Sequence, residues 1–200
     1  MAQENSLQFD ILIVGGGPAG LASAIRLAQL NQKEKKSLTV CVLEKGAKIG
    51  AHIISGCVLN PRSLNKLIPN WRDLSTPITT GVKKDKFYYL TQGKAIRYPV
   101  PPQMINRGNY MISLSQLCTW LGQYAEQLGI TVIPGYAAKD YIYDDNKKEI
   151  TGVITGEMGR KKDHSKNNQY QPGVKIYAKK TILAEGCKGS ITEQIIEKFH

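Results

Sequence analysis

The sequence predicts an α/β protein organised around a parallel sheet, and three features near its start support this. An apolar run rich in branched residues, 9–14, leads directly into the glycine-rich segment 15–20. Residues 21–28 then have the composition of a helix. A second continuous apolar run, 38–43, is of the kind that lies buried in parallel sheets. This order is typical of the first βαβ unit of a Rossmann-like dinucleotide-binding domain.

The segment 15–20 has the form G-x-G-x-x-G, and each of its three glycines is expected to have a separate role. Gly15 allows a tight turn out of the strand, Gly17 leaves the backbone open to a pyrophosphate, and Gly20 lets the helix pack close to the sheet. The helix that follows begins with free N–H groups and partial positive charge, which favour phosphates. The turn is therefore a predicted diphosphate site.

Glu44 stands at the end of the second apolar run, twenty-four residues after Gly20. An acidic side chain at this point accepts hydrogen bonds from the adenosine ribose hydroxyls, and its charge repels a 2′-phosphate. The sequence therefore favours FAD or NAD over NADP as the cofactor. The alternative is that Glu44 only caps a strand end at the surface.

Small residues gather directly after Glu44, in the segment 45–57. This is the edge of the sheet where α/β folds bind ligands, and a backbone without large side chains can approach a ribityl chain or flavin ring closely. The alternative interpretation is an ordinary flexible loop.

The rest of the chain is predicted to alternate between further sheet strands and β-rich insertions. Residues 77–112 are predicted to form a β-rich excursion from the dinucleotide-binding sheet. A second helix is predicted over 114–128, followed by a parallel strand over 130–134. Residues 137–178 are predicted to form a β-hairpin and flap, with a strand of that excursion at 174–177.

A last buried strand is predicted to start at residue 180 and to end in the segment 184–186, before a helix over 190–199. In flavoproteins with two dinucleotide folds, a strand with this ending returns to the first sheet and closes around the flavin. Glu185 is expected to cap the turn or hold backbone N–H groups near the cofactor. The alternative, a catalytic base, lacks any partner base, nucleophile or metal ligand.

Composition and charge narrow the class of protein. The formal net charge is +11, and the lysines are scattered rather than concentrated on one helix or interleaved with aromatic residues. This scatter disfavours nucleic-acid binding and favours a solvated surface, with attraction to anionic lipid or an acidic partner as the alternative. No apolar run approaches the ~20 residues needed to cross a bilayer. Only a short polar segment precedes residue 9, so no signal peptide is expected.

The four cysteines include no C-x-x-C pair, and only three histidines accompany them. The sequence therefore predicts neither a zinc site nor an iron–sulfur cluster. Cys41 and Cys118 are predicted to be small core residues, whereas Cys57 and Cys187 lie in glycine-rich loops near the expected cofactor. All four thiols fit a reducing compartment.

Beyond these patterns, the sequence resembles one known family over essentially the whole chain, the electron transfer flavoprotein–ubiquinone oxidoreductases. The glycine motif is shared by many flavoproteins, but the segments 49–56 and 135–138 are much more specific. The resemblance implies FAD-mediated electron transfer from reduced electron transfer flavoprotein to ubiquinone at a membrane surface. The segments that carry it are 15–20, 44–56, 108–110, 134–138 and 184–187.

The resemblance also implies a longer protein. Family members continue for several hundred residues beyond a segment of this kind, and that part carries most of the quinone-entry surface and four cysteines that hold a four-iron four-sulfur cluster. The chain is therefore expected to be the N-terminal portion of the FAD-binding domain, without the cluster and not competent alone. The expected location is the bacterial cytoplasm or the cytoplasmic face of the inner membrane, or the mitochondrial inner membrane for a processed eukaryotic protein.

No catalytic side chain and no metal ligand is predicted, because the chemistry belongs to the flavin. Two other hypotheses stay open: a fragment of an FAD-dependent hydroxylase or prenyl reductase, and a non-catalytic truncated FAD-binding module. The predicted cofactor-binding residues are Gly15, Gly17, Pro18, Ala19, Gly20, Glu44, Lys45, Gly50, Ala51, Ser55, Gly56, Ala138, Ala184, Glu185 and Gly186.

Overall fold

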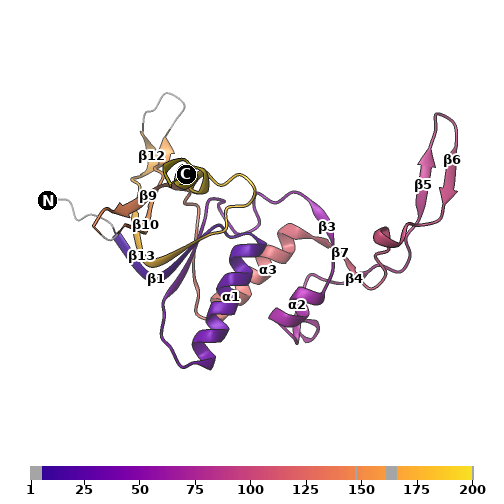
Figure 1. The fold of residues 1–200 in the computed structure, drawn as a ribbon, viewed down its shortest axis with the longest axis horizontal. Helices are drawn as coiled ribbons and strands as arrows, with labels where there is room; N and C mark the ends of the chain where they lie inside the picture. Colours follow the sequence, from indigo (N-terminus) through magenta and orange to yellow (C-terminus); the bar gives the residue numbers. More distant parts are fainter. Residues whose placement is uncertain (1–5, 147, 161–165, 200) are drawn as a thin grey trace. The chain divides into compact units, whose positions relative to one another are not determined.

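The computed structural model describes residues 6–146, 148–160 and 166–199 (Figure 1). The chain divides into two compact units. Unit 1 comprises residues 1–52 and 118–200, and unit 2 comprises residues 53–117.

Unit 1 is built on a six-stranded sheet with the strand order β8-β2-β1-β13-β10-β9. The central strand β1 (Ser6–Val14) pairs in parallel with β2 (Val40–Glu44) on one side and with β13 (Lys175–Leu183) on the other. Strand β8 (Thr131–Pro134) adds a further parallel neighbour to β2. The predicted α/β fold with a parallel Rossmann-like sheet is confirmed.

The two remaining strands extend this sheet in the antiparallel sense. Strand β10 (Glu149–Thr155) pairs with the first half of β13, and β9 (Ala138–Asp144) pairs with β10. The predicted hairpin is thus part of the main sheet. In the region predicted to be a flap, β11 (Met158–Arg160) pairs with β12 (Lys166–Gln171), and residues 161–165 lie outside the described residues.

The prediction of two strands at 174–177 and 180–183 is wrong, because β13 is one continuous strand. Its nine residues run alongside β1 over the full length of that strand, with Lys175 opposite Ser6 at one end and Leu183 opposite Val14 at the other. Lys179 and Lys180 interrupt the apolar pattern, which makes one strand look like two in the sequence. The ammonium group of Lys179 is satisfied by an ion pair with Asp10, 2.7 Å from Nζ to Oδ1.

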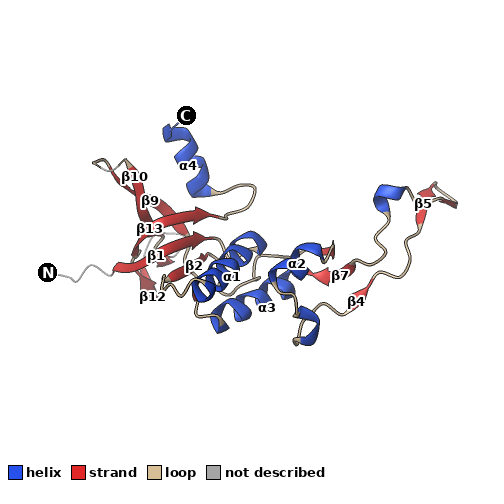
Figure 2. Ribbon diagram, turned by 60° about the horizontal axis from the view of Figure 1, so that its bottom comes forward, coloured by secondary structure: helices blue, strands red, loops and turns tan. Residues whose placement is uncertain are grey.

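Three helices accompany the sheet. Helix α1 (Pro18–Lys33) connects β1 to the segment before β2, and it lies beside α3 (Leu114–Gln127) in both ribbon views (Figures 1 and 2). Helix α4 (Ser190–Phe199) contacts β9. Among the described residues, no helix is long and apolar enough to span a bilayer.

The end of β1 and most of β2 are buried on both faces. Because successive side chains of a strand point to opposite faces, Leu12 and Val14 lie on one face of β1 and Ile13 on the other. The first face carries a buried cluster, and helix α1 contributes its own buried side chains to the core. The cluster comprises Leu12, Val14, Cys41, Leu43, Val153, Ile176 and Ala178, and the α1 side chains are Leu21, Ala24, Ile25 and Ala28.

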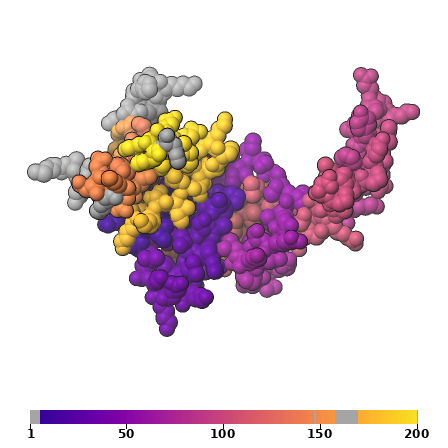
Figure 3. Space-filling view, in the orientation of Figure 1, coloured from indigo at the N-terminus to yellow at the C-terminus, as the bar shows by residue number. Residues whose placement is uncertain are grey.

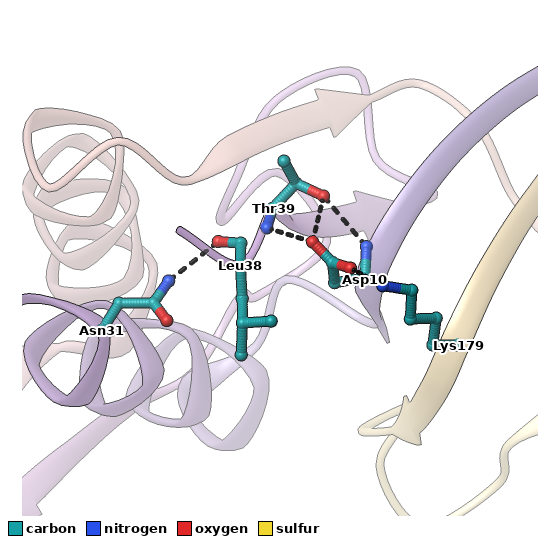
Figure 4. Close-up of polar contacts among 5 residues, drawn as sticks. All are labelled: Asp10, Asn31, Leu38, Thr39 and Lys179. Carbon is teal, nitrogen blue, oxygen red and sulfur yellow. Dashed lines mark hydrogen bonds and ion pairs between the residues drawn. The ribbon is translucent and has the colours of Figure 1, made fainter. Parts of the chain in front are cut away.

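A polar network joins the middle of β1 and β13 to the segment that enters β2 (Figure 4). The Asp10 carboxylate accepts hydrogen bonds from the Thr39 backbone N–H at 2.7 Å and from its hydroxyl at 2.9 Å. Its other oxygen pairs with Lys179. Asn31 of α1 donates to the Leu38 carbonyl at 2.8 Å. The network therefore ties together β1, β13 and the segment entering β2.

These contacts predict a pH-dependent contribution of Asp10 to stability. The Lys179 ammonium, followed by the Thr39 donors, lowers the pKa of Asp10 from 3.8 to about 2. A carboxyl with a depressed folded-state pKa stabilises the fold above its unfolded pKa, and this stabilisation is lost as the pH falls through the folded value. We expect the difference in Tm between the wild type and Asp10→Asn to be constant above pH 4 and to shrink between pH 4 and about 2.

Thermal melts of the two proteins across this pH range test the prediction. Lys180→Ala is a matched control, because Lys180 and Glu149 lie 3.9 Å apart at the exposed surface. If the difference in Tm between the wild type and D10N is the same at pH 2 as at higher pH, the ionised carboxylate of Asp10 contributes nothing to stability.

Unit 2 contains a small antiparallel sheet in which β7 (Tyr110–Ser113) lies between β3 (Gly56–Leu59) and β4 (Thr80–Gly81). The Trp71 side chain is fully buried and packs edge-on against Tyr110, with ring centroids 5.5 Å apart. Unit 2 is wider than the predicted excursion of 77–112. It also contains the helix α2 (Arg62–Leu67) and the short 3-10 helices η1 (Trp71–Asp73) and η2 (Pro102–Met104).

Within the predicted β-rich excursion, β5 (Phe87–Leu90) and β6 (Ala95–Tyr98) form a hairpin, and they pair only with each other among the described strands. Every residue of both strands is exposed. Figure 3 shows these side chains on the surface, where no other part of unit 2 covers them in that view.

Candidate functional site

Three parallel strands of unit 1 end together, and the glycine turn follows the central one. Val14 pairs with Leu43 on one side and with Leu183 on the other. Backbone hydrogen bonds continue past the strand ends, since Gly15 N–H donates to the Leu43 carbonyl and Ala184 N–H donates to the Val14 carbonyl, both at 2.8 Å. The segments after β1, β2 and β13 therefore meet at the carboxyl edge of the sheet, where α/β folds bind ligands.

Close packing requires glycine at two positions of the turn. Gly15 has φ +112°, and a Cβ there would lie 2.3 Å from the Ala184 carbonyl oxygen. A Cβ at Gly20 would lie 1.9 Å from the Gly15 carbonyl oxygen. The predicted tight turn at Gly15 and the close helix packing at Gly20 are confirmed.

Gly17 is different, because the space beside it is open. It is the N-cap residue of α1, no side chain caps the helix, and no atom lies within 4 Å of the position that a Cβ would take. Pro18 has no N–H, and the N–H groups of Ala19 and Gly20 precede the first intrahelical hydrogen bond, from Leu21 to Gly17. Free donors and a positive helix end beside open space fit an anionic diphosphate.

The carboxylate of Glu44 joins the glycine turn to the next loop. One oxygen accepts the Gly16 N–H at 2.8 Å, and the other accepts the Gly46 N–H at 2.7 Å. Glu44 is half-buried, so it is more than a surface cap of a strand. A carboxylate has about four acceptor positions, which leaves capacity for two ribose hydroxyls. Lys45 beside it is exposed.

Replacing Glu44 with glutamine should therefore weaken both the turn and nucleotide binding. The amide NH₂ would face a backbone N–H donor, and a hydrogen bond to a charged group contributes about 1.5–3 kcal/mol. We expect Glu44→Gln to raise the FAD dissociation constant about tenfold or more and to lower the Tm. Flavin fluorescence titration and thermal melts measure both. Glu197→Gln on exposed α4 is the control. Unchanged affinity in E44Q would exclude a nucleotide-binding role for this carboxylate.

The loop after Glu44 is fixed by backbone hydrogen bonds. The Tyr136 N–H donates to the Glu44 carbonyl at 3.0 Å, and the Gly135 N–H donates to the Gly46 carbonyl at 2.8 Å. The Ala51 N–H donates to the Lys48 carbonyl at 3.1 Å. Gly50 is buried, and its φ is +83°. In the part that belongs to unit 1, the alternative of an ordinary flexible loop is therefore not supported.

Three other predicted residues belong to other segments of the chain. Ser55 and Gly56 belong to unit 2, where the Ser55 carbonyl accepts the Leu114 N–H at 3.4 Å and Gly56 begins β3. Ala138 begins β9 in unit 1, pairs with Thr155 and packs against the buried sheet cluster. Unit 1 by itself brings together the predicted residues of the segments after β1, β2 and β13.

Glu185 holds backbone N–H groups, as one of the expected roles requires, and these groups belong to the start of helix α4. The Glu185 carboxylate accepts hydrogen bonds from the Ile191 N–H at 3.3 Å and from the Thr192 N–H and hydroxyl, both at 2.9 Å. These bonds hold the start of α4 and engage both carboxylate oxygens. The neighbouring Gly186 has φ +86°, is exposed and has no atom within 4 Å of its Cβ position.

The site also depends on a residue that the sequence analysis missed. Gly16 donates the hydrogen bond to Glu44, and a Cβ at this position would lie 2.4 Å from Ile49 Cδ1. The G-x-G-x-x-G pattern leaves this position undefined. The run of three glycines at 15–17 is the signal that would have identified it.

The thiols of Cys41 and Cys118 are fully buried, which confirms their predicted place in the core. Burial raises the pKa of the Cys41 thiol to about 12. Cys57 and Cys187 are exposed. Over residues 6–146, 148–160 and 166–199, no three histidine, cysteine or acidic side chains gather as they would around a metal ion.

A cavity of about 190 Å³ is lined by residues of β10, β13 and α4, and none of them belongs to the glycine turn. It is mainly apolar, and Lys180 and Glu149 contribute to its rim. None of the residues that line it is a predicted cofactor contact. The candidate site is therefore the open cradle at the carboxyl edge of the sheet rather than this cavity.

Comparison with known proteins supports a dinucleotide-binding fold. Residues 13–69 match the family model described as an NAD(P)-binding Rossmann-like domain. Three solved structures are similar in fold, at 18–21% identity. A geranylgeranyl bacteriochlorophyll reductase-like protein from Thermoplasma acidophilum matches with a TM-score of 0.60, over 90% of this chain and 39% of that chain. THI4 from Thermovibrio ammonificans matches with a TM-score of 0.60, over 96% of this chain and 63% of that chain. The flavin-dependent monooxygenase PieE, in complex with FAD and substrate, matches with a TM-score of 0.59, over 94% of this chain and 32% of that chain.

Several curated relatives match nearly the whole chain. A mitochondrial protein of Dictyostelium discoideum is 48% identical over 98% of this chain, and one of Oryza sativa is 50% identical over 96%. A protein of Pseudomonas aeruginosa is 44% identical over 97%. The chain spans about a third of the length of these relatives, namely 32%, 33% and 36%. All three are named electron transfer flavoprotein–ubiquinone oxidoreductase, so the resemblance predicted from the sequence is confirmed over nearly the whole chain.

Proposed function

We propose that unit 1 binds FAD at the carboxyl edge of its sheet, as part of a flavoprotein oxidoreductase that passes electrons from reduced electron transfer flavoprotein to ubiquinone. The observation that carries the proposal is the open position at Gly17 beside a tethered carboxylate, Glu44. Relatives 44–50% identical to this chain bear the name of that activity. Because the chain spans about a third of their length, the complete electron transfer is proposed for the longer protein.

Each part of the cofactor has proposed partners. The diphosphate lies at Gly17, Ala19 and Gly20, and Glu44 accepts hydrogen bonds from the ribose. The backbone at Gly50 and Ala51 approaches the ribityl chain or the flavin. The remaining proposed contacts are Gly15, Pro18, Lys45, Ser55, Gly56, Ala138, Ala184, Glu185 and Gly186.

FAD, when bound, supplies the redox chemistry, and the protein supplies binding, orientation and electrostatics. The amide groups at the start of α1 neutralise diphosphate charge, and the acceptor capacity of Glu44 selects a free 2′-hydroxyl. No proton-transfer residue is required of this chain. The Glu185 carboxylate, which the sequence offers as an alternative base, is engaged by α4.

We also propose that the β5–β6 hairpin of unit 2 contacts a membrane surface, where ubiquinone is dissolved. Tyr89 and Leu90 are 61% and 73% exposed, and lysines at 83, 84 and 86 precede the hairpin. Aromatic residues at an interface with flanking lysines favour anionic bilayers. The proposed location is accordingly the inner face of a bacterial membrane or the mitochondrial inner membrane. The exposed apolar side chains of the hairpin are Phe87, Tyr88, Tyr89, Leu90, Ile96 and Tyr98.

Co-sedimentation with vesicles tests the membrane contact. We expect binding to vesicles that contain anionic phospholipid, and we expect Leu90→Asp to abolish it. Ile196→Asp is the matched control, because Ile196 is an exposed apolar residue of α4. Equal sedimentation of L90D and the wild type would refute a role for the hairpin.

The visible spectrum of the purified chain during FAD titration tests the cofactor proposal. We expect a perturbed flavin spectrum and saturable quenching of flavin fluorescence, without NAD(P)H oxidation. NAD(P)H oxidation would instead favour a hydroxylase or prenyl reductase. A folded protein that does not perturb FAD at millimolar concentration would contradict FAD binding by this chain.

A further inference from the structure

Ile49 lies between the nucleotide-binding turn and helix α3. Its side chain is buried, and its Cδ1 occupies the space into which a Cβ at Gly16 would project, 2.4 Å from that position. The Glu44 carboxylate also contacts Gly16. Its Oε2 accepts the Gly16 N–H and lies 3.0 Å from the position that a Cβ at Gly16 would take. Gly16 is thus held between a buried aliphatic side chain and a carboxylate.

Helix α3 supports Ile49 at two points. A Cβ at Gly122 would lie 3.2 Å from Ile49 Cγ1 and 3.3 Å from Cγ2, which is closer than the usual ~3.5–4.0 Å between carbon atoms. The Thr119 hydroxyl donates to the Ile49 carbonyl at 3.1 Å. One turn of α3 therefore contacts both the side chain and the backbone of Ile49.

We propose that Thr119 and Gly122 are positioning residues for the cofactor site, and that they act through Ile49 on Gly16. The proposal rests on the proposed function. Glycine at 122 lets Ile49 lie close to α3, so that Cδ1 contacts Gly16 without pushing it toward the phosphate position at Gly17. The Thr119 hydroxyl fixes the Ile49–Gly50 peptide, which places the backbone proposed to approach the flavin.

Gly122→Ala separates this role from a simple effect on folding. Alanine is a better helix former than glycine, so the substitution favours α3 itself. The added methyl group pushes Ile49 toward Gly16, and overpacking of this kind typically costs enough to change a dissociation constant about tenfold. We therefore expect G122A to bind FAD about tenfold more weakly while its Tm falls little or rises. Gln123→Ala, on the exposed face of α3, is the control.

A second substitution tests the route through Ile49. Ile49→Val removes Cδ1, the atom that contacts Gly16, so the double variant I49V/G122A is expected to recover FAD affinity to within about threefold of I49V. Thr119→Val should weaken FAD binding about threefold, and Thr119→Ser, which keeps the hydroxyl, should not. Equal losses of affinity in G122A and I49V/G122A would overturn the proposal.

A measurement on the unliganded protein tests the coupling between Gly122 and Gly16 independently of the proposed function. The Gly16 amide, which donates to Glu44, should shift in the ¹H–¹⁵N spectrum of unliganded G122A and return toward its wild-type position in I49V/G122A. If the wild-type chain binds no FAD but the Gly16 resonance behaves in this way, only the proposed function fails. An unshifted Gly16 amide in folded G122A would refute the coupling.

Discussion

Gly17→Asp is expected to abolish FAD binding while the protein stays folded with an unchanged or higher Tm. Gly17 is the N-cap residue of α1, has ordinary extended backbone angles (φ −83°, ψ −176°) and has open space where a side chain would project. Aspartate is among the best N-cap residues, because its carboxylate accepts hydrogen bonds from the N–H groups of the first turn. Those N–H groups are the ones proposed to bind the diphosphate.

The expected loss of affinity is large because two effects combine. The new carboxylate occupies the donors, and it repels the diphosphate by about 4 kcal/mol for unit charges 4 Å apart at an effective dielectric constant near 20. We expect the dissociation constant to rise at least about a hundredfold. Gly17→Asn caps the helix without a charge and should give an intermediate loss. FAD titrations and thermal melts measure both, and Gly93→Asp in the β5–β6 turn is a distant control with equally open space.

Gly15→Ala, two residues away in the same motif, should instead act mainly on stability. The position needs φ +112°, and an alanine Cβ would lie 2.3 Å from the Ala184 carbonyl oxygen, a backbone atom that no rotamer change can move. Backbone strain and overpacking each cost about 1–3 kcal/mol. The sum is a large share of the ~5–15 kcal/mol that stabilises a typical domain.

We therefore expect G15A to lower the Tm by about 10 °C or to prevent folding, whereas Gly17→Ala should change the Tm by only a few degrees. Thermal melts followed by circular dichroism measure the Tm of both variants. A G15A protein as stable as G17A would contradict the close contact between the turn and the end of β13.

The part of unit 1 from β1 to β2 was predictable because its signals are local. Branched apolar runs, a glycine turn and an acidic residue at the next strand end follow one another within the first 44 residues, and each reflects a nearby steric or electrostatic requirement. The role of Glu185 in holding backbone N–H groups was likewise predictable, since its partners Ile191 and Thr192 are close in sequence.

Contacts between distant segments were not predictable in the same way. The continuity of β13 is visible only in its pairing with β1, whose partner residues lie more than 160 positions away in the sequence, and Lys179 within the strand pairs with Asp10 of β1. Gly122 reads as an unremarkable helix residue in the sequence, because the Ile49 side chain that requires it is more than seventy positions away. The predicted boundaries of 77–112 are too narrow for unit 2, since β7 pairs with β3, which begins at Gly56.

The most direct test of the nucleotide site is a ¹H–¹⁵N titration of the chain with FAD, which detects even weak binding residue by residue. We predict that the largest amide shifts fall on residues 16, 17, 19 and 20 and on residues 44–51, with smaller shifts at 184–186. The cavity between β10, β13 and α4 should be unaffected. Shifts centred on that cavity, or no shifts at the start of α1 at saturating FAD, would contradict the assignment of this turn as the diphosphate site.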